Sequence, residues 1–549
     1  MAGRNIKITD QGAVIFSEDE AGAKTVSLKA PSDVTDNYAT SLPATAISGT
    51  NLINATRSGS EPYDVTLSFQ PAANVGMAGV NVLNHSVTGT ALVTNTGDDT
   101  TNIAAAVNAA ETSGANGLSE RLVFPAGGYR LKELGKAGVH DCFAYDKNYW
   151  FEGAGMGMTN MFCAMDGAGV SGTHSMIELA GSPPRFFGIT DMTFDGNGGG
   201  TDSEDLAAIN ISADYIVIDN VEFKNFTDPI LRITGAPKFV SITNCRFTDL
   251  VENEVESRQA MVCLDGVSSP ECTFIFDGNH MVAYPDEAST DGDSLNGVNV
   301  APNAVGRKIR CFIKNNYFSK LGNPAVTPWA AVTLEPGCHD SVISNNIFDN
   351  CVHSSIHVAS CNNIEISNNT LAGEDAEMPT AEGYDVVGIY VDSDGTSSSN
   401  LRITGNSITG TVKTCIGIKV LGDVGTSNSI DGVIIADNVI DGCKKSISVD
   451  KVKGKVDIVR NSIKNDSAAT EALVATRHSV YINDIMGATK LSIIGNSFTG
   501  GSNSGGAIHF DRSLDPQTAS EVHVVLKDNF FDRMGQHADW SNGATVLND

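Results

Sequence analysis

One pattern of apolar and polar positions repeats along most of the chain, from Ile216 to Phe531. Each copy has two apolar residues around a spacer, one or two polar residues, an Asn, a second spacer and a large apolar residue, as in Val240–Phe247. The asparagines of successive copies are Asn220, Asn244, Asn279, Asn316, Asn346, Asn369, Asn406, Asn438, Asn461, Asn496 and Asn529.

The spacing of these asparagines is typical of a solenoid. Asn220 and Asn529 are 309 residues apart (529 minus 220) in ten steps, a mean period of about 31 residues. The steps are uneven, from 23 residues (Asn346 to Asn369) to 37 residues (Asn279 to Asn316). Fixed strands joined by loops of different length would produce this unevenness.

A second short strand follows each Asn unit and alternates between apolar and other residues, as Ile356-His-Val358 and Ile389-Tyr-Val391 do. This alternation places one face of the strand inward and the other outward. Short strands that each pair with the same strand of the next repeat form a parallel β-helix. We therefore predict that the asparagines stack about 4.8 Å apart at a corner and hydrogen-bond along the stack.

Composition fits an all-β solenoid and argues against a nucleic-acid-binding or membrane-spanning protein. Charged residues are 18% of the 549 residues, Gly numbers 55, and the net charge is -29. Such acidity disfavours nucleic acid as a partner. No apolar run predicts a signal peptide or a membrane span.

The 11 cysteines show neither disulfide-framework nor zinc spacing. We therefore expect reduced, mostly buried thiols, among them Cys263, Cys311 and Cys361, with no structural metal and no cofactor.

We predict four regions. Residues 1–48 form a small N-terminal β domain, 49–97 a neck, 98–535 the β-helix, and 536–549 a C-terminal tail. The helix expected at 100–111 has Thr101 or Asn102 as its N-cap and covers the first coil.

Three segments near the start of the solenoid carry a resemblance to a known superfamily. In order they are Leu122–Tyr129 (LVFPAGGY), Trp150–Gly155 (WFEGAG) and Phe187–Gly196 (FGITDMTFDG), after the expected helix. They are similar to the opening of the pectate-lyase-like right-handed β-helices, a group of lyases, hydrolases, epimerases and adhesins. The resemblance implies the right-handed fold for residues 98–535, but not one activity.

A second resemblance lies at the N-terminus, in Val26–Pro31 (VSLKAP) and Tyr38–Pro43 (YATSLP). These segments resemble the start of bacteriophage tail fibres and tailspikes. The resemblance implies a homotrimer in the virion, attached through its N-terminus to the phage tail or an adaptor. It also implies a host surface polysaccharide, O-antigen or capsule, as the ligand.

Aligning the second strands predicts a row of outward residues that includes His357 and Tyr390. The residues just beyond these strands form a second row that holds Asp265, Glu335 and Asp392, each two coils from the next. At roughly 9 to 10 Å between backbones, two such carboxyls suit an inverting glycosidase, whose acid and base lie about 6.5 to 9.5 Å apart. Glu335, Asp392 and Asp265 are the candidate catalytic residues.

Long loops are expected beside this patch, at 284–295, 322–329 and 371–385. Aromatic side chains stack well on sugar rings, and these loops carry Tyr284, Trp329 and Tyr384. The candidate substrate-binding residues are His357, Tyr390, Trp329, Tyr284, Tyr384 and Asp394.

The sequence leaves the reaction open. Polysaccharide hydrolysis is the first hypothesis, and a non-catalytic receptor-binding adhesin or a polysaccharide lyase are the alternatives. Arg232 and Lys419 are the cations a lyase would use, but both are expected several coils from the loops. Asp291–Asp293 and Asp392–Gly395 resemble fragments of calcium loops, yet no bidentate Glu follows them. The Asn-Thr-Asp and Gly-His-Gly motifs of polygalacturonases are absent.

Overall fold

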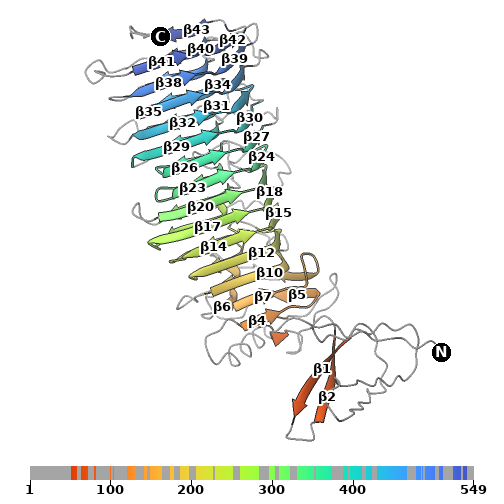
Figure 1. The fold of residues 1–549 in the computed structure, drawn as a ribbon. Helices are drawn as coiled ribbons and strands as arrows, with labels where there is room; N and C mark the ends of the chain where they lie inside the picture. The colour runs from red at the N-terminus through yellow and green to blue at the C-terminus, as the bar shows by residue number, and fades with distance from the viewer. Residues whose placement is uncertain are drawn as a thin grey trace, which may run out of the picture. The chain divides into compact units, whose positions relative to one another are not determined.

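A computed structural model shows the arrangement of much of the chain (Figure 1). It describes residues 51–58, 64–71, 80–81, 99, 103, 120–131, 141–144, 149–163, 174–178, 186–196, 206–226, 229–250, 260–283, 296–302, 308–321, 330–351, 354–373, 387–393, 396–410, 416–422, 429–465, 478–483, 485, 489–500, 506–510, 523–532, 534 and 536–540. The chain divides into two compact units, residues 1–81 and 82–549.

The first unit contains an antiparallel pair of strands. β1 (Asn51–Ser58) pairs with β2 (Asp64–Pro71), and β3 (Val80–Asn81) follows. Both the N-terminal β domain at 1–48 and the domain boundaries remain predictions, because residues 1–50 lie outside the described part of the chain.

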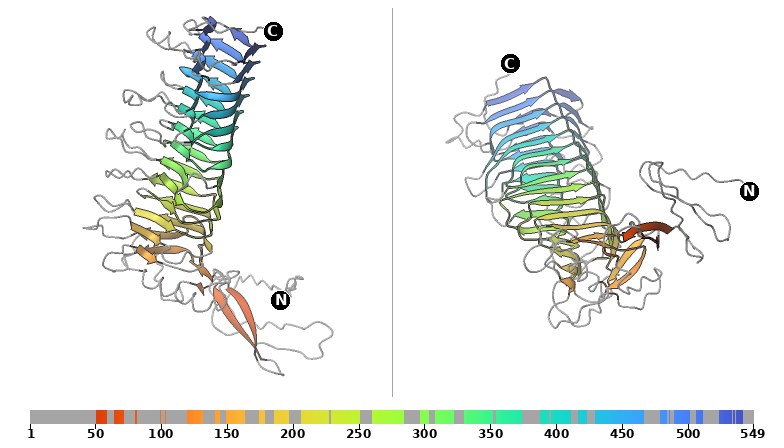
Figure 2. Two further views of the ribbon diagram at one scale, coloured as in Figure 1. Left: turned by 90° about the vertical axis from the view of Figure 1, so that its left-hand side faces the viewer. Right: turned by 60° about the horizontal axis from the view of Figure 1, so that its bottom comes forward.

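The second unit is a right-handed parallel β-helix, as predicted, with coils stacked along one axis (Figures 1 and 2). One of its sheets has 14 parallel strands and is called the 14-stranded sheet. It comprises β6 (Asp141–Ala144), β9 (His174–Glu178), β11 (Leu206–Ile211), β13 (Leu231–Ile233), β16 (Ala260–Val267), β19 (Asn296–Pro302), β22 (Ala330–Leu334), β25 (Ser354–Ala359), β28 (Val387–Asp392), β31 (Ile416–Leu421), β34 (Lys445–Asp450), β37 (His478–Asn483), β40 (Gly506–Phe510) and β43 (Gln536–Trp540).

A second face, the long-strand sheet, precedes the Asn corner of each coil. It comprises β4 (Glu120–Val123), β7 (Tyr149–Glu152), β10 (Phe186–Asp195), β12 (Tyr215–Lys224), β14 (Phe239–Thr243), β17 (Glu271–Asp277), β20 (Lys308–Lys314), β23 (His339–Ser344), β26 (Asn362–Ser367), β29 (Ser398–Thr404), β32 (Ile430–Ala436), β35 (Val452–Val459), β38 (Lys490–Ile494) and β41 (His523–Lys527).

Short strands after the corner make the third face, the corner sheet. They are β5 (Gly127–Leu131), β8 (Thr159–Cys163), β15 (Arg246–Leu250), β18 (His280–Ala283), β21 (Tyr317–Ser319), β24 (Ile347–Asp349), β27 (Thr370–Ala372), β30 (Ser407–Thr409), β33 (Val439–Asp441), β36 (Ser462–Asn465), β39 (Ser497–Gly500) and β42 (Phe530–Asp532). In β10 and β12 the strand continues through the corner, so its two halves pair with different faces.

The inward residues form continuous apolar columns along the axis. Phe318 and Phe348 are fully buried, and their ring centroids are 5.0 Å apart on adjacent coils. Phe223 and Phe247 repeat this contact at 5.2 Å. One long core thus takes the place of several globular ones.

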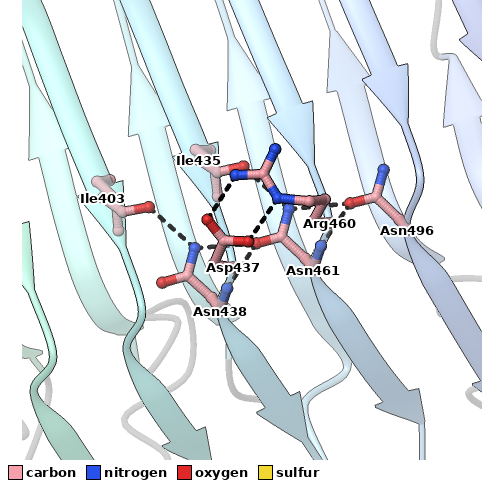
Figure 3. Close-up of polar contacts among 7 residues, drawn as sticks. All are labelled: Ile403, Ile435, Asp437, Asn438, Arg460, Asn461 and Asn496. Carbon is pink, nitrogen blue, oxygen red and sulfur yellow. Dashed lines mark hydrogen bonds and ion pairs between the residues drawn. The ribbon is translucent and has the colours of Figure 1, made fainter.

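The predicted Asn ladder runs from Asn279 to Asn529, with one residue in each coil. Figure 3 shows the part of it that contains Asn438, Asn461 and Asn496. Asn438 is representative of the ladder. Its Nδ2 donates to Asn461 Oδ1 at 2.9 Å and to the Ile403 carbonyl at 2.9 Å. Its Oδ1 accepts from the Asn406 backbone N–H at 2.9 Å and from Asn406 Nδ2 at 3.0 Å. The ladder therefore satisfies buried backbone groups at every corner.

Asn220 and Asn244 were wrongly assigned to this ladder. Both occupy the preceding corner position, where the backbone is left-handed, with φ of 54° at each residue. Asn tolerates that conformation better than most residues, so the corner has two places that favour it. Asn315-Asn316 fills both of them. In the coil of Asn244 the ladder position holds Cys245, whose backbone N–H donates to Asn279 Oδ1 at 2.8 Å.

The cysteines of the described residues fit the prediction of reduced, buried thiols. Nine of them are free and buried, Cys263, Cys311 and Cys361 included. Burial raises the pKa of Cys245 to about 12, and raises that of Cys272 likewise. These thiols therefore remain protonated and behave as small apolar side chains.

The predicted capping helix at 100–111 lies outside the described residues apart from Ile103. Ile103 is buried, and its N–H donates to the Asp99 carbonyl at 2.9 Å. The described residues contain no helix long and apolar enough to span a membrane.

Candidate functional site

The outward row of the 14-stranded sheet has the register that the alternation predicted. Adjacent strands pair Thr333 with His357, His357 with Tyr390, and Tyr390 with Lys419. The full row is Arg232, Cys263, Asn299, Thr333, His357, Tyr390, Lys419, Ser448, Tyr481 and His509. These side chains therefore lie one above another on one face.

The three candidate carboxylates follow the same sheet along one edge. Asp265 is in β16, Glu335 directly follows β22, and Asp392 ends β28. The strand order β16-β19-β22-β25-β28 places each of them two coils from the next. The Glu335 N–H donates to the Val300 carbonyl at 3.0 Å, which continues the sheet pairing to this residue.

Asp392 is in contact with the imidazole of His357. His357 Nε2 lies 3.1 Å from Asp392 Oδ2, with the two side chains 3% and 14% exposed. The residues come from adjacent strands, so the sheet itself fixes their approach. A buried imidazole beside a carboxylate is a group able to orient that carboxylate or to transfer a proton.

An aromatic and cationic stack continues from this pair along the row. The His357 and Tyr390 rings stack with centroids 5.0 Å apart and planes at 18°. Lys419 Nζ lies 5.2 Å from the Tyr390 centroid. Lys419 was expected several coils from the long loops, which lie mostly outside the described residues. Its strand, β31, pairs directly with β28, so Lys419 is one coil from Tyr390 and Asp392.

The other two carboxylates differ in their neighbours. Asp265 Oδ2 lies 3.3 Å from Arg232 Nη2, and the Asp265 side chain is 48% exposed. Glu335 Oε1 accepts from Asn299 Nδ2 at 3.4 Å. An arginine lies beside Asp265, whereas the Asn299 amide that donates to Glu335 is neutral.

Polar atoms on this face are buried without hydrogen-bond partners. Between Asn299 and Asp392 they are Thr333 Oγ1, His357 Nδ1, Asn299 Oδ1 and Asp392 Oδ1, and further along the same sheet they include Arg232 Nε and Asp450 Oδ1. Buried polar atoms in folded proteins nearly always have a partner, whether protein, water or ligand. Four such atoms between Asn299 and Asp392 mark a place that suits hydroxyl groups or water.

Four candidate substrate-binding residues, Tyr284, Trp329, Tyr384 and Asp394, lie outside the described residues, as do Asp291 and Asp293. Their contribution to the site remains a prediction. Among the residues that are described, no group of three or more His, Cys, Asp or Glu side chains is placed to hold a metal ion.

A second aromatic and cationic cluster lies further along the same sheet. His478 stacks on His509 with centroids 4.2 Å apart, and Tyr481 is 5.5 Å from His509. Lys445 Nζ lies 3.9 Å from the Tyr481 centroid. Alternation placed Tyr481 and His509 in the outward row but missed His478 and Lys445. These two residues begin their strands and pair with each other, a position that the second-strand alignment did not cover.

No protein-family model and no curated protein sequence matches the chain. Solved structures with a similar fold include a tailspike protein of E. coli bacteriophage HK620 in complex with a pentasaccharide, 13% identical, with a TM-score of 0.47 over 84% of this chain and 80% of that chain. PfbA, a surface adhesin of Streptococcus pneumoniae, is 15% identical, with a TM-score of 0.41 over 86% and 96%. The A-module of the Azotobacter vinelandii mannuronan C-5 epimerase AlgE4 is 17% identical, with a TM-score of 0.38 over 85% and 99%.

Proposed function

We propose that this chain binds a polysaccharide on the 14-stranded sheet and hydrolyses it with Glu335 and Asp392. The observation that carries the proposal is the environment of Asp392. One carboxyl oxygen is held by His357, while the other, Oδ1, is buried and has no partner. Asp392 is therefore oriented, with a lone pair available to a water molecule.

In this mechanism the two carboxyls act on opposite sides of the glycosidic bond. Asp392 Oδ1 takes a proton from a water molecule as the water oxygen attacks the anomeric carbon. Glu335 in its protonated form gives its proton to the departing glycosidic oxygen, so the bond breaks without a charged leaving group. The separation of two coils, roughly 9 to 10 Å between backbones, leaves room for the water and predicts inversion at the anomeric carbon.

The wider proposal is a phage tailspike. It rests on the resemblance of residues 26–31 and 38–43 to the start of phage tail proteins and of residues 98–535 to pectate-lyase-like β-helices. In this role the N-terminus attaches to the phage tail or an adaptor, three copies associate, and the β-helix meets O-antigen or capsule at the host cell surface.

The test is incubation of the whole protein with purified capsules and O-antigens, followed by sizing and reducing-end assays. We expect oligosaccharides from one of them, and Glu335→Gln should lower that rate about 10² to 10⁴-fold. The matched control is Glu365→Gln, which changes an exposed carboxylate on the long-strand sheet and should leave the rate unchanged. Binding without product in the unaltered protein would instead assign an adhesin.

β-Elimination is the second candidate, favoured by the position of Lys419 over Tyr390. In a uronic acid unit, a base on the enzyme removes the proton beside the carboxylate. A cation stabilises the resulting enolate, and the C–O bond breaks as a C=C bond forms, with a proton passing to the leaving oxygen. His357 or Tyr390 would be the base and Lys419 the cation.

The Lys419→Met variant separates these two reactions. Elimination predicts a loss of about 10²-fold or more and products with the ultraviolet absorbance of an unsaturated sugar. Hydrolysis predicts reducing ends without that absorbance and a smaller effect of this change. Lys455→Met on the long-strand sheet is the matched control.

A further inference from the structure

The outward face of the 14-stranded sheet carries two pairs of a lysine and a tyrosine. Lys419 Nζ lies 5.2 Å from the Tyr390 ring centroid, and Lys445 Nζ lies 3.9 Å from the Tyr481 ring centroid. In each pair the two residues come from neighbouring strands, in the order β28-β31-β34-β37. The two tyrosines are therefore three coils apart, about 14 Å along the axis. Only the first of these pairs lies beside the proposed catalytic residues.

The charge of this face is opposite to that of the whole chain. The chain has 65 Asp and Glu residues against 36 Lys and Arg residues. The outward row from Arg232 to His509 nevertheless contains no carboxylate. A locally basic face on an acidic protein favours an anionic ligand.

The nearest carboxylates do not neutralise the two lysines. Asp392 and Asp450 lie at the edge of the sheet, where they end β28 and β34. Among the described residues, Asp392 has His357 as its charged partner, and Asp450 forms no ion pair. The positive charge of Lys419 and Lys445 is thus not balanced by the carboxylates of their own sheet.

The second pair has room beside it for a ligand. Ser448 lies between Lys419 and Tyr481 in the outward row and pairs in register with both. Its side chain is much smaller than theirs, so the face is lower at this coil. Lys445 begins the same strand and Asp450 ends it. Asp450 Oδ1 is buried and has no hydrogen-bond partner, which makes it available to accept from a hydroxyl group.

Two further rings fix the position of Tyr481. The centroids of His478 and His509 lie 6.0 Å and 5.5 Å from the Tyr481 centroid, and all three rings are stacked. A ring held on its neighbours keeps a constant place for the Lys445 ammonium group above it. The cation is therefore held at this coil before any ligand arrives, which lowers the entropy cost of binding.

We infer that Lys445, Ser448, Asp450 and Tyr481, here called the Ser448 site, bind a sugar unit that carries a carboxylate, such as a uronic acid. Lys445 contacts the carboxylate through a charge-assisted hydrogen bond, Asp450 Oδ1 accepts from a sugar hydroxyl, and the sugar ring packs beside Tyr481. The inference rests on the proposed function for the general class of ligand, a polysaccharide, and adds that this polysaccharide is acidic. Asp450 lies two coils beyond Asp392, so one glycan along the axis reaches both sites.

The experiment measures binding and compares two forms of one polysaccharide. From the capsules and O-antigens tested for cleavage, one that carries carboxylates and is retained by the protein is chosen. Its carboxylates are then reduced to primary alcohols. The unaltered protein should bind the reduced form about 10 to 100-fold more weakly, because a hydrogen bond to a charged group is lost. If the protein retains only neutral polysaccharides, the inference is wrong.

The Lys445→Met variant assigns this difference to the Ser448 site. It should bind the native form about 10 to 100-fold more weakly than the unaltered protein, and the reduced form equally well. Lys490→Met is the matched control, since Lys490 is an exposed lysine that begins β38 on the long-strand sheet, and it should bind both forms as the unaltered protein does. Circular dichroism verifies that both variants fold. Unchanged binding of the native form by Lys445→Met, or an equal loss for both forms, would overturn the inference.

The result can be read separately from the proposed reaction. If Glu335→Gln cleaves as fast as the unaltered protein, the proposed reaction fails, while the effect of carboxyl reduction on binding still tests the Ser448 site. If cleavage depends on Glu335 but the native and reduced forms bind equally, only the Ser448 site is wrong. Binding that falls only after phosphate groups are removed from the polysaccharide would also overturn the assignment of a carboxylate.

Discussion

Asp392→Asn should lower polysaccharide cleavage about 10² to 10⁴-fold while leaving binding intact. The amide is almost the same size as the carboxylate and can still contact His357, so the local geometry is kept. It cannot take a proton from water, and this is the step that the mechanism assigns to Asp392. Reducing-end release under saturating substrate measures the rate constant, and retention on immobilised polysaccharide measures binding.

Asp457→Asn is the matched control for this variant. The Asp457 side chain is 14% exposed, as Asp392 is, and its carboxylate also contacts a nitrogen-bearing side chain, that of Lys455, but it belongs to the long-strand sheet. The same chemical change there should leave the rate within about twofold, which corresponds to a surface effect of roughly 0.5 kcal/mol. Equal rates for both variants would remove Asp392 from the mechanism. If Asp392→Asn loses little of the cleavage rate and Lys419→Met loses much of it, the results would instead favour elimination.

The outward row could be predicted from sequence because it depends only on the period of a strand. Once Ile356 and Val358 are assigned inward, His357 must point outward, and parallel in-register pairing places Tyr390 above it. Such reasoning ends where a residue leaves the strand pattern. His478 and Lys445 begin their strands outside the aligned triplets, so no alternation connected them with Tyr481.

The chemistry of each carboxylate could not be predicted in the same way. Asp265, Glu335 and Asp392 occupy equivalent positions in the sequence pattern, yet Arg232 pairs with Asp265, Asn299 contacts Glu335 and His357 contacts Asp392. Those partners come from the preceding coil, 33 to 36 residues earlier in the chain, and side-chain reach decides which contact forms. Sequence spacing carries no information about that reach.

The Asn ladder shows the same limit at the corner of each coil. The spacing predicted a stack of amides, and the structure has one from Asn279 to Asn529. A single residue separates the ladder position from the left-handed position before it, and both favour Asn for different physical reasons. Only the hydrogen bonds distinguish them. Asn279 Oδ1 accepts from the Cys245 N–H of the preceding coil, whereas the exposed Asn244 Nδ2 donates to Asp219 at 2.9 Å.

Asn438→Asp should destabilise the β-helix by about 4 kcal/mol at neutral pH. The change replaces the Nδ2 donor with an oxygen that faces two buried acceptors, the Ile403 carbonyl and Asn461 Oδ1. Both lose this donor, and Asn461 Oδ1 keeps the bond from the Asn438 backbone N–H at 3.0 Å. Each orphaned buried group costs about 1 to 3 kcal/mol, and burying an ionised carboxylate costs more. Thermal unfolding followed by circular dichroism should show a midpoint lower by several degrees.

Asn400→Asp is the control with the same atomic change at an exposed position. Asn400 has φ of 56°, a conformation that Asp also tolerates, and its Nδ2 makes one exposed hydrogen bond to Asn363 Oδ1 at 2.9 Å. The thermal unfolding midpoint of the Asn400→Asp variant should therefore change little. A large effect at Asn400, or none at Asn438, would contradict the assignment of the buried ladder as the element that stabilises the corner.

The pH dependence of Asn438→Asp provides an independent check. Burial among acceptors favours the protonated carboxyl, so the pKa of the introduced group is higher in the folded state than in the unfolded chain. A protonated carboxyl can donate to Ile403 or Asn461 and restores one of the two lost bonds. The folded variant is therefore least destabilised below the unfolded pKa, and loses stability as pH rises through the folded pKa. Asn400→Asp has its carboxyl in water and should lack this pH dependence. We therefore expect the difference in unfolding midpoint between the two variants to widen from acidic to neutral pH.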